Sequence, residues 1–147
     1  MKKIIAYTDG GARGNPGPAA VGVVFHNGKK KVIEKHSEYI GDNLTNNIAE
    51  YRAIIFALEK FKERFGKKLA KETEMEIRTD SELVYKQFKG EYKIKDEKMQ
   101  RLFIELRNLT VDYKSVKMKK ISRNYNKGAD SLVNEELDKK EKENKLL

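Results

Sequence analysis

The hydrophobic periodicity of this 147-residue chain changes partway along its length, and that change restricts the fold more than any other feature. Residues 3–9, 20–26 and 31–40 are rich in β-forming residues, and the Asn27-Gly28 pair predicts a hairpin turn between the second and third runs. Apolar residues then recur at helical spacing from Ile48 to Phe61. The first part of the chain therefore predicts an antiparallel meander of three strands, followed by a helix.

The second half of the chain alternates between strand and helix patterns. Strands are expected at residues 74–79 and 115–121, and helices at residues 80–88, 99–109 and 129–137. This order predicts an α/β fold with a mixed sheet and helices on its faces, in which right-handed crossovers place the last two strands parallel to the first. We expect one domain over residues 1–147, with a turn-rich loop at residues 10–18 and a charged end at residues 138–145 that frays.

Basic residues outnumber acidic residues, since 32 Lys and Arg against 23 Asp and Glu give a net charge of +9. This charge favours a polyanionic partner such as nucleic acid, with a merely soluble Lys-rich surface as the alternative. The chain has no cysteine, which excludes a disulfide scaffold, a thiolate metal site and a Cys nucleophile. No apolar run approaches the roughly 20 residues that span a bilayer, and no secretory signal is visible, so we expect no membrane association and a cytoplasmic location.

Four carboxylates fall where the expected strands end or the expected helices begin. Asp9 and Asp80 end the first and fourth strands, while Glu50 and Asp130 lie near the starts of the first and last helices. In open α/β sheets, ligands bind outside the carboxyl ends of the strands. Clustered carboxylates there repel one another unless a cation or proton joins them, and hard divalent cations such as Mg²⁺ prefer such oxygen ligands.

Each carboxylate also has a purely structural interpretation. Asp9 could belong to an Asp-Gly turn, and Asp80 could cap the helix that follows it. Glu50 could complete a capping box with Asn47, and Asp130 could be a favourable charge in the first turn of its helix. Any one of these motifs is weak alone, but four carboxylates at one side of a sheet favour a shared site.

Four sequence motifs, taken together, resemble type 1 ribonuclease H, or ribonuclease HI, of the ribonuclease H-like superfamily. The resemblance covers nearly the whole chain. It implies a five-stranded mixed sheet of order 3-2-1-4-5 with helices on both faces. The motifs are YTDGGARGNPGPAA at residues 7–20, TNNIAEYRAIIFAL at 45–58, RTDSELVYKQ at 78–87 and SRNYNKGADSL at 122–132.

The resemblance also implies a function and a catalytic set. Family members hydrolyse the RNA strand of RNA–DNA hybrids as endonucleases, leaving 5′-phosphate and 3′-hydroxyl ends. It assigns catalysis and the binding of two Mg²⁺ ions, with Mn²⁺ as a substitute, to Asp9, Glu50, Asp80 and Asp130. Asp9 is the best candidate for a ligand shared by both ions, because it lies on the central strand.

Recognition of the hybrid is expected from neutral side chains that can contact 2′-hydroxyls. The resemblance places minor-groove contacts at Asn15, Asn46 and Asn47, and a DNA-phosphate contact at Thr45. The alternative is that Asn15 only forms a turn and the other three residues only begin a helix.

The sequence departs from many members of the family in two places. Residues 90–96 connect two helices directly, so the extra helix and basic loop called the handle are absent, and Lys93 and Lys95 are the expected substitutes. The loop before Asp130 has no His, and Arg123 is its nearest functional substitute, although it is always charged and cannot act as a general acid. Asn126 matches a family Asn four residues before the final Asp, and we expect it to contact substrate.

Two other functions remain open at this stage. The chain could be a binding module without catalysis, or a relative that acts on DNA or on double-stranded RNA. The intact set of carboxylates argues against the first, and the three Asn residues favour a hybrid over the second. We expect a monomer.

Overall fold

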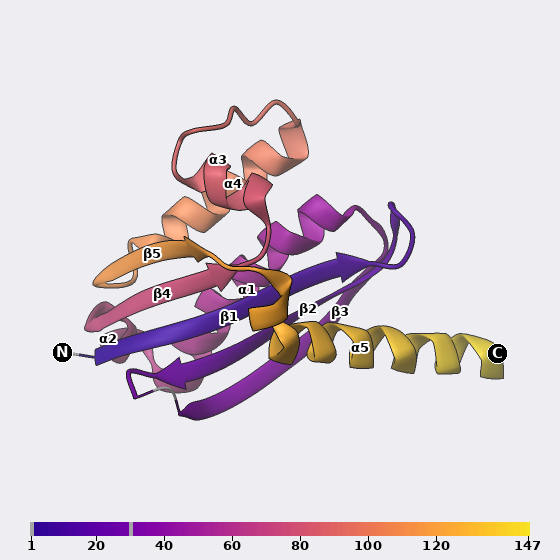
Figure 1. Ribbon diagram of the computed structural model, residues 1–147, viewed down its shortest axis with the longest axis horizontal. Helices are drawn as coiled ribbons and strands as arrows, with labels where there is room; N and C mark the ends of the chain where they lie inside the picture. Colours follow the sequence, from indigo (N-terminus) through magenta and orange to yellow (C-terminus); the bar gives the residue numbers. More distant parts are fainter. Residues whose placement is uncertain (1, 30) are drawn as a thin grey trace.

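The first three strands of the computed structural model, which describes residues 2–29 and 31–147, form the predicted meander (Figure 1). The strands β1 (Lys2–Ala12) and β2 (Gly17–Asn27) pair antiparallel, as do β2 and β3 (Val32–Leu44). The strands β4 (Thr73–Thr79) and β5 (Ser115–Lys120) extend the sheet in parallel on the other side of β1. The strand order β3-β2-β1-β4-β5 confirms the predicted fold class.

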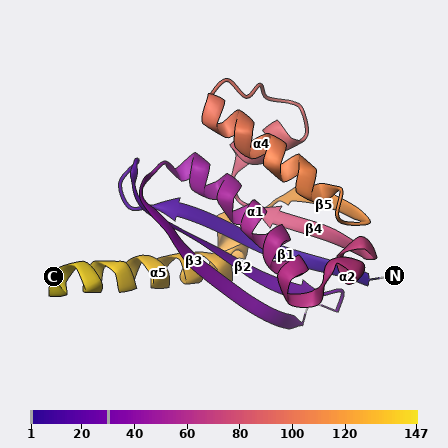
Figure 2. The same cartoon turned by 180° about the vertical axis from the view of Figure 1, so that it is seen from behind.

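Helices cover both faces of this sheet (Figure 2). The long helix α1 (Asn46–Phe65) lies against β1 and β2, with α4 (Glu97–Thr110) packed beside it. Helix α5 (Lys127–Leu146) lies against the opposite face, over β1, β2 and β3. Three short elements connect these parts: α2 (Lys67–Lys71), α3 (Glu82–Phe88) and the 3₁₀ turn η1 (Arg123–Tyr125).

The main core lies between α1 and the sheet. On β4 the alternate residues Thr73, Met75, Ile77 and Thr79 are buried, as a strand with one covered face requires. Helix α1 buries most of one side, including Tyr51, whose hydroxyl donates to Gln87 Oε1 at 2.5 Å. This packing holds α1 against β1 and β2, and the Tyr51 hydrogen bond joins α1 to α3.

The segment expected to be a long turn is mostly strand. Residues 10–12 continue β1 and residues 17–18 already belong to β2, so only residues 13–16 form the connection. The strands continue because Gly10, Gly11 and Ala12 still pair with Val21, Ala20 and Ala19.

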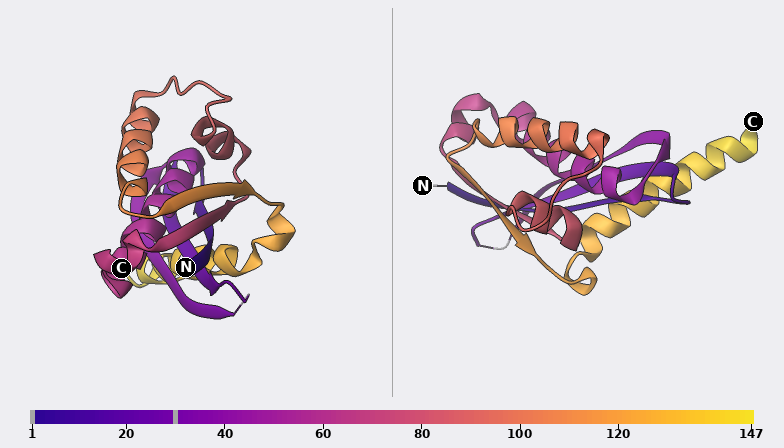
Figure 3. Two further views of the ribbon diagram at one scale, coloured as in Figure 1. Left: turned by 90° about the vertical axis from the view of Figure 1, so that its left-hand side faces the viewer. Right: turned by 90° about the horizontal axis from the view of Figure 1, so that it is seen from above.

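The charged end of the chain does not fray, because α5 continues to Leu146. Its last buried residue is Leu137, and beyond that point the helix projects past the sheet (Figure 3). Asp138 and Glu141 each pair with Arg13, at 2.8 Å, which supports this part of the helix from the β1–β2 connection.

The connection between α3 and α4 contains no further helix, as predicted, so the basic handle is absent. Within residues 2–29 and 31–147, no helix combines the length and apolar character needed to cross a membrane.

Candidate active site

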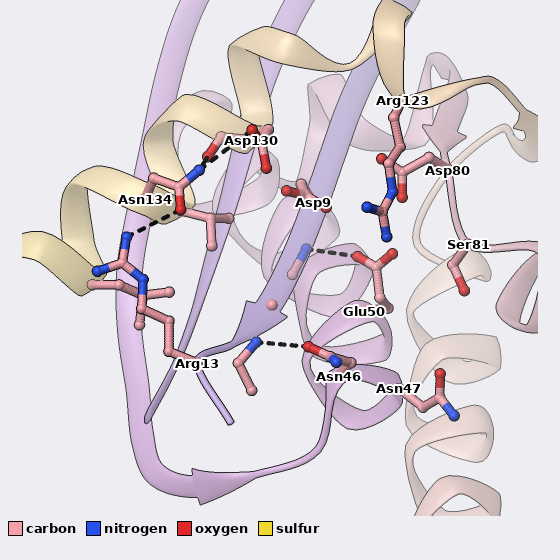
Figure 4. Close-up of a pocket in the computed structure, with 15 residues that line it drawn as sticks. Asp9, Arg13, Asn46, Asn47, Glu50, Asp80, Ser81, Arg123, Asp130 and Asn134 are labelled. Atoms are coloured by element: carbon pink, nitrogen blue, oxygen red, sulfur yellow. Dashed lines mark hydrogen bonds between the residues drawn. The ribbon is translucent and has the colours of Figure 1, made fainter. Parts of the chain in front are cut away.

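Three of the four predicted carboxylates meet at the carboxyl edge of the sheet (Figure 4). Asp9 comes from β1, Asp80 directly follows β4, and Glu50 lies in the second turn of α1. Each offers a carboxylate oxygen, and these oxygens all lie within 4.8 Å of one another. The parallel pairing of β1 with β4 is what brings residues 71 positions apart to one point.

Glu50 is held by the backbone of β1. The Gly10 N–H donates to Glu50 Oε1 at 2.6 Å. A Cβ at Gly10 would lie 2.0 Å from the Ala49 carbonyl oxygen, so only glycine allows α1 to approach β1 this closely. The capping-box alternative for Glu50 is wrong, because α1 is capped by Thr45, whose Oγ1 accepts from the Ile48 N–H at 3.3 Å.

Asp80 is likewise no helix cap. Ser81 caps α3, since its Oγ accepts from the Val84 N–H at 3.2 Å. Asn126 holds Asp80 instead: its Nδ2 donates to Asp80 Oδ2 at 3.2 Å and to the Thr8 carbonyl oxygen at 2.8 Å. Because Asn126 is only 1% exposed, its side chain faces Asp80 and the backbone of β1, in place of the expected substrate surface.

The negative charges of the three clustered carboxylates are not balanced by basic side chains of the described residues. Burial, together with the nearby charges of Asp80 and Asp130, raises the pKa of Asp9 to about 8. Burial, Asp9 and Asp80 also raise the pKa of Glu50 well above its usual value. Among the described residues, no lysine or arginine forms an ion pair with Asp9, Glu50 or Asp80. Unbalanced carboxylate oxygens at this spacing fit a divalent cation.

Asp130, the fourth predicted carboxylate, borders this cluster from the first turn of α5. Asp130 is exposed, and its negative charge contributes to the raised pKa of Asp9. Its carboxylate does not belong to the cluster formed by Asp9, Glu50 and Asp80. Asn134, one turn later, donates to Asp130 Oδ2 at 3.3 Å.

The four carboxylates line one cleft of about 430 Å³, together with other polar residues. Arg123 extends from η1 toward Asp80, and Asn46 and Asn47 lie at the start of α1 (Figure 4). Asn15 and Thr45 line an adjoining hollow with Asn47. Lys93 and Lys95 belong to neither hollow and lie exposed on the α3–α4 connection.

Asn15 and Asn46 form a hydrogen-bonded pair beside the cleft. Asn46 Oδ1 accepts from the Ala12 N–H at 2.9 Å, and Asn15 Oδ1 accepts from the Asn46 N–H at 3.0 Å. Both amide oxygens are therefore engaged with the backbone, which leaves the NH₂ groups as donors toward a ligand.

Two residues that line the cleft, Arg13 and Asn134, are not predicted from the sequence. Arg13 lies within a motif that was interpreted as a turn. Asn134 follows Asp130 by four residues, a spacing that places two side chains on the same face of a helix and was a usable signal.

Comparisons with known proteins show which family this chain is similar to. The family model described as "Reverse transcriptase-like" matches residues 7–136. Ribonuclease HI of Halobacterium salinarum is 39% identical over 92% of this chain and 65% of its own length. The bifunctional protein Rv2228c of Mycobacterium tuberculosis is 32% identical over 92% of this chain, which spans only 36% of that protein.

Two of the solved structures that this chain resembles are also ribonucleases H. The crystal structure of LC11-RNase H1 in complex with RNA/DNA hybrid has a TM-score of 0.87 and 44% identity, and covers 92% of this chain and 97% of that chain. RNase H1 from Halobacterium salinarum has a TM-score of 0.85 and 36% identity, and covers 93% of this chain and 98% of that chain. The chain belongs to the ribonuclease H1 family.

Proposed function

We propose that this chain is a metal-dependent endonuclease that hydrolyses the RNA strand of RNA–DNA hybrids. The observation that carries this proposal is the cluster of Asp9, Glu50 and Asp80, whose oxygens lie within 4.8 Å of one another and, within residues 2–29 and 31–147, form no ion pair with Lys or Arg. LC11-RNase H1, which shares 44% identity with this chain, has been solved in complex with RNA/DNA hybrid.

The four carboxylates are proposed to hold two divalent cations, Mg²⁺ or Mn²⁺. Two such ions, when bound, activate a water molecule as nucleophile and stabilise charge on the leaving oxygen of a phosphodiester. Asp9 is the best candidate for a shared ligand, because its charge interacts with both Asp80 and Asp130 and also with Glu50. Glu50 and Asp80 are fixed before any ion binds, by the Gly10 N–H and by Asn126.

The surface beside the cluster is proposed to bind the hybrid. The NH₂ groups of Asn15 and Asn46 suit acceptor atoms such as 2′-hydroxyl oxygens, because their own oxygens are engaged. Asn47 and Thr45 line the same surface and would contact the minor groove and a DNA phosphate.

Basic residues would contact the charged backbone of the substrate. Arg123 enters the cleft and would hold a phosphate or the cut product, while Lys93 and Lys95 would add salt-sensitive phosphate contacts. A cytoplasmic location and a monomeric state remain predictions.

The test is cleavage of three labelled duplexes: an RNA–DNA hybrid, an all-DNA duplex and an all-RNA duplex, each with Mg²⁺ or EDTA. We expect cut RNA only in the hybrid and only with Mg²⁺, with 5′-phosphate and 3′-hydroxyl ends. Asp80→Asn is the matched control, because it keeps the side-chain shape and removes the charge.

Other outcomes of this assay would overturn the proposal. Cleavage of the all-RNA duplex at a similar rate would remove the assigned specificity. Hybrid binding without cleavage would indicate a binding module. Products with a 2′,3′-cyclic phosphate would indicate attack by the RNA's own hydroxyl.

A further inference from the structure

We propose that Asn134 is a positioning residue for Asp130, and that Arg13 fixes the orientation of Asn134. In this arrangement, hydrogen bonds join the β1–β2 connection and the fourth carboxylate into one unit. The inference rests on the proposed function, since it assigns a role in cation binding at the same site.

The hydrogen bonds around Asn134 define this unit (Figure 4). Asn134 Nδ2 donates to Asp130 Oδ2 at 3.3 Å and to the Asp130 carbonyl oxygen at 3.2 Å. On its other side, Asn134 Oδ1 accepts from Arg13 Nη2 at 3.2 Å. A guanidinium group has only donors, so the amide oxygen must face Arg13 and the amide NH₂ must face Asp130.

Arg13 is itself held in place. Its Nη1 lies 2.8 Å from Asp138 Oδ1 and 2.8 Å from Glu141 Oε1. These pairs are partly exposed, so each contributes little to stability, but three acceptors around one guanidinium fix its position. Beyond Leu137, α5 has no buried residue, and its contacts with the domain include the two ion pairs of Arg13 and the Lys140 ammonium over the Tyr39 ring.

Asp130 needs such support more than its neighbours do. Asp9 and Glu50 are 8% and 9% exposed, whereas Asp130 is exposed on a helix surface. A free side chain loses conformational entropy when it binds an ion, and a hydrogen bond that preselects its orientation lowers that cost.

The unit also reaches the proposed substrate surface. Arg13 lies two residues before Asn15, whose Oδ1 accepts from the Asn46 N–H at the start of α1. The short connection is therefore tied to α1 on one side and to α5 on the other. A duplex that contacts Asn15 would steady the same connection that orients Asn134.

The test compares Asn134→Ala with Asn144→Ala, a matched change at an exposed position of the same helix outside the network. Both changes favour the helix, because Ala has the higher helix propensity, so the variants are expected to fold. Mn²⁺ binding is measured by calorimetry without substrate, hybrid cleavage as a function of Mg²⁺ concentration, and the melting temperature in EDTA.

We expect Asn134→Ala to weaken Mn²⁺ binding and to raise the half-saturating Mg²⁺ concentration, each by about tenfold. The melting temperature in EDTA and the cleavage rate at saturating Mg²⁺ should stay close to those of the parent. Asn144→Ala should match the parent in every measurement. Arg13→Gln should shift the Mg²⁺ dependence in the same direction, and should add nothing once Asn134 is Ala.

Unchanged Mn²⁺ binding in Asn134→Ala, or additive effects of the two changes, would overturn the inference. Loss of melting temperature without a shift in metal binding would show a structural role only. A parent that binds Mn²⁺ but does not cut hybrids would overturn the proposed function alone. If the parent cuts hybrids and Asn134→Ala has the same Mg²⁺ dependence and Mn²⁺ binding as the parent, only the positioning role is overturned.

Discussion

Glu34 on β3 and Asp9 on β1 are carboxylates of the same sheet with opposite surroundings. Glu34 accepts two hydrogen bonds from Arg64, at 3.0 and 2.9 Å, and its pKa falls to about 2, chiefly because of that guanidinium. Asp9 is buried beside two other carboxylates, and its pKa rises to about 8. Arg64 balances the charge of Glu34 within the fold. Asp9 has no such partner among the described residues, and we expect a bound cation to balance its charge. Four experiments test this difference.

Removal of the Asp9 charge should have the largest effect. Asp9→Asn is expected to lower hybrid cleavage by more than about a thousandfold, since the change removes a group of the reacting centre. In EDTA the same variant should melt at a higher temperature, because burial and the nearby charges of Asp80 and Asp130 disfavour the ionised Asp9 carboxylate. Glu34→Gln is the matched control and should keep full cleavage. A cleavage rate near that of the parent would contradict the assignment of Asp9.

The pH dependence of stability without metal is the second test. Because its pKa is raised in the folded state, Asp9 makes folding less favourable as pH rises from about 4 to about 8. The parent should therefore lose stability relative to Asp9→Asn by up to about 1.4 kcal/mol per pH unit in this window.

Denaturant unfolding in EDTA at several pH values measures this difference. Saturating Mg²⁺ should remove or reverse it, because a cation favours the ionised carboxylates. A difference that does not change with pH would show that the Asp9 charge is already balanced.

Gly10→Ala tests the backbone contact that supports Glu50. The new Cβ would lie 2.0 Å from the Ala49 carbonyl oxygen, so α1 must move away from β1. We expect a loss of about 1–3 kcal/mol in the free energy of unfolding, together with lower cleavage. Gly11→Ala is the matched control, because its Cβ would meet only Val133 Cγ1 at 3.7 Å. Equal effects of the two changes would argue against a special contact at Gly10.

Glu34→Gln should have the smallest effect on stability. A lowered pKa means that the Arg64 pair stabilises the fold above the unfolded-state pKa and loses this contribution as pH falls toward 2. We expect a slight loss of stability near neutral pH that shrinks in acid and in high salt. A large loss at neutral pH would contradict the surface character of this pair.

The sequence predicted the strands of the sheet and the positions of the clustered carboxylates, because short sequence patterns are enough to recognise both. Alternation and helical spacing predicted the strands and helices, and the resemblance to ribonuclease H implied their order in the sheet. Asp9 and Asp80 come together once β1 and β4 are parallel. The partners of these residues were harder to predict. The N–H that holds Glu50 and the amide that holds Asp80 belong to Gly10 and Asn126, which are 40 and 46 residues away along the chain.

Burial separated Asn126 from the other predicted contact residues. The expectation of a substrate contact rested on the resemblance, which matches Asn126 to a family Asn four residues before the final Asp and says nothing of its burial. In the structure the side chain forms no cap and donates to Thr8 and Asp80. The helical end of α5 was unexpected for a similar reason, because two of its charged residues, Asp138 and Glu141, pair with Arg13, more than 120 positions earlier in the chain.

The projecting end of α5 determines how this domain can be joined to another. The nine residues from Asp138 to Leu146 form about 13 Å of helix beyond the last buried side chain. A domain fused after Leu147 would sit at the end of a semi-rigid spacer instead of a flexible linker. A truncation before Glu141 would shorten that spacer and also remove a partner of Arg13, so the practical limit for shortening lies after residue 141.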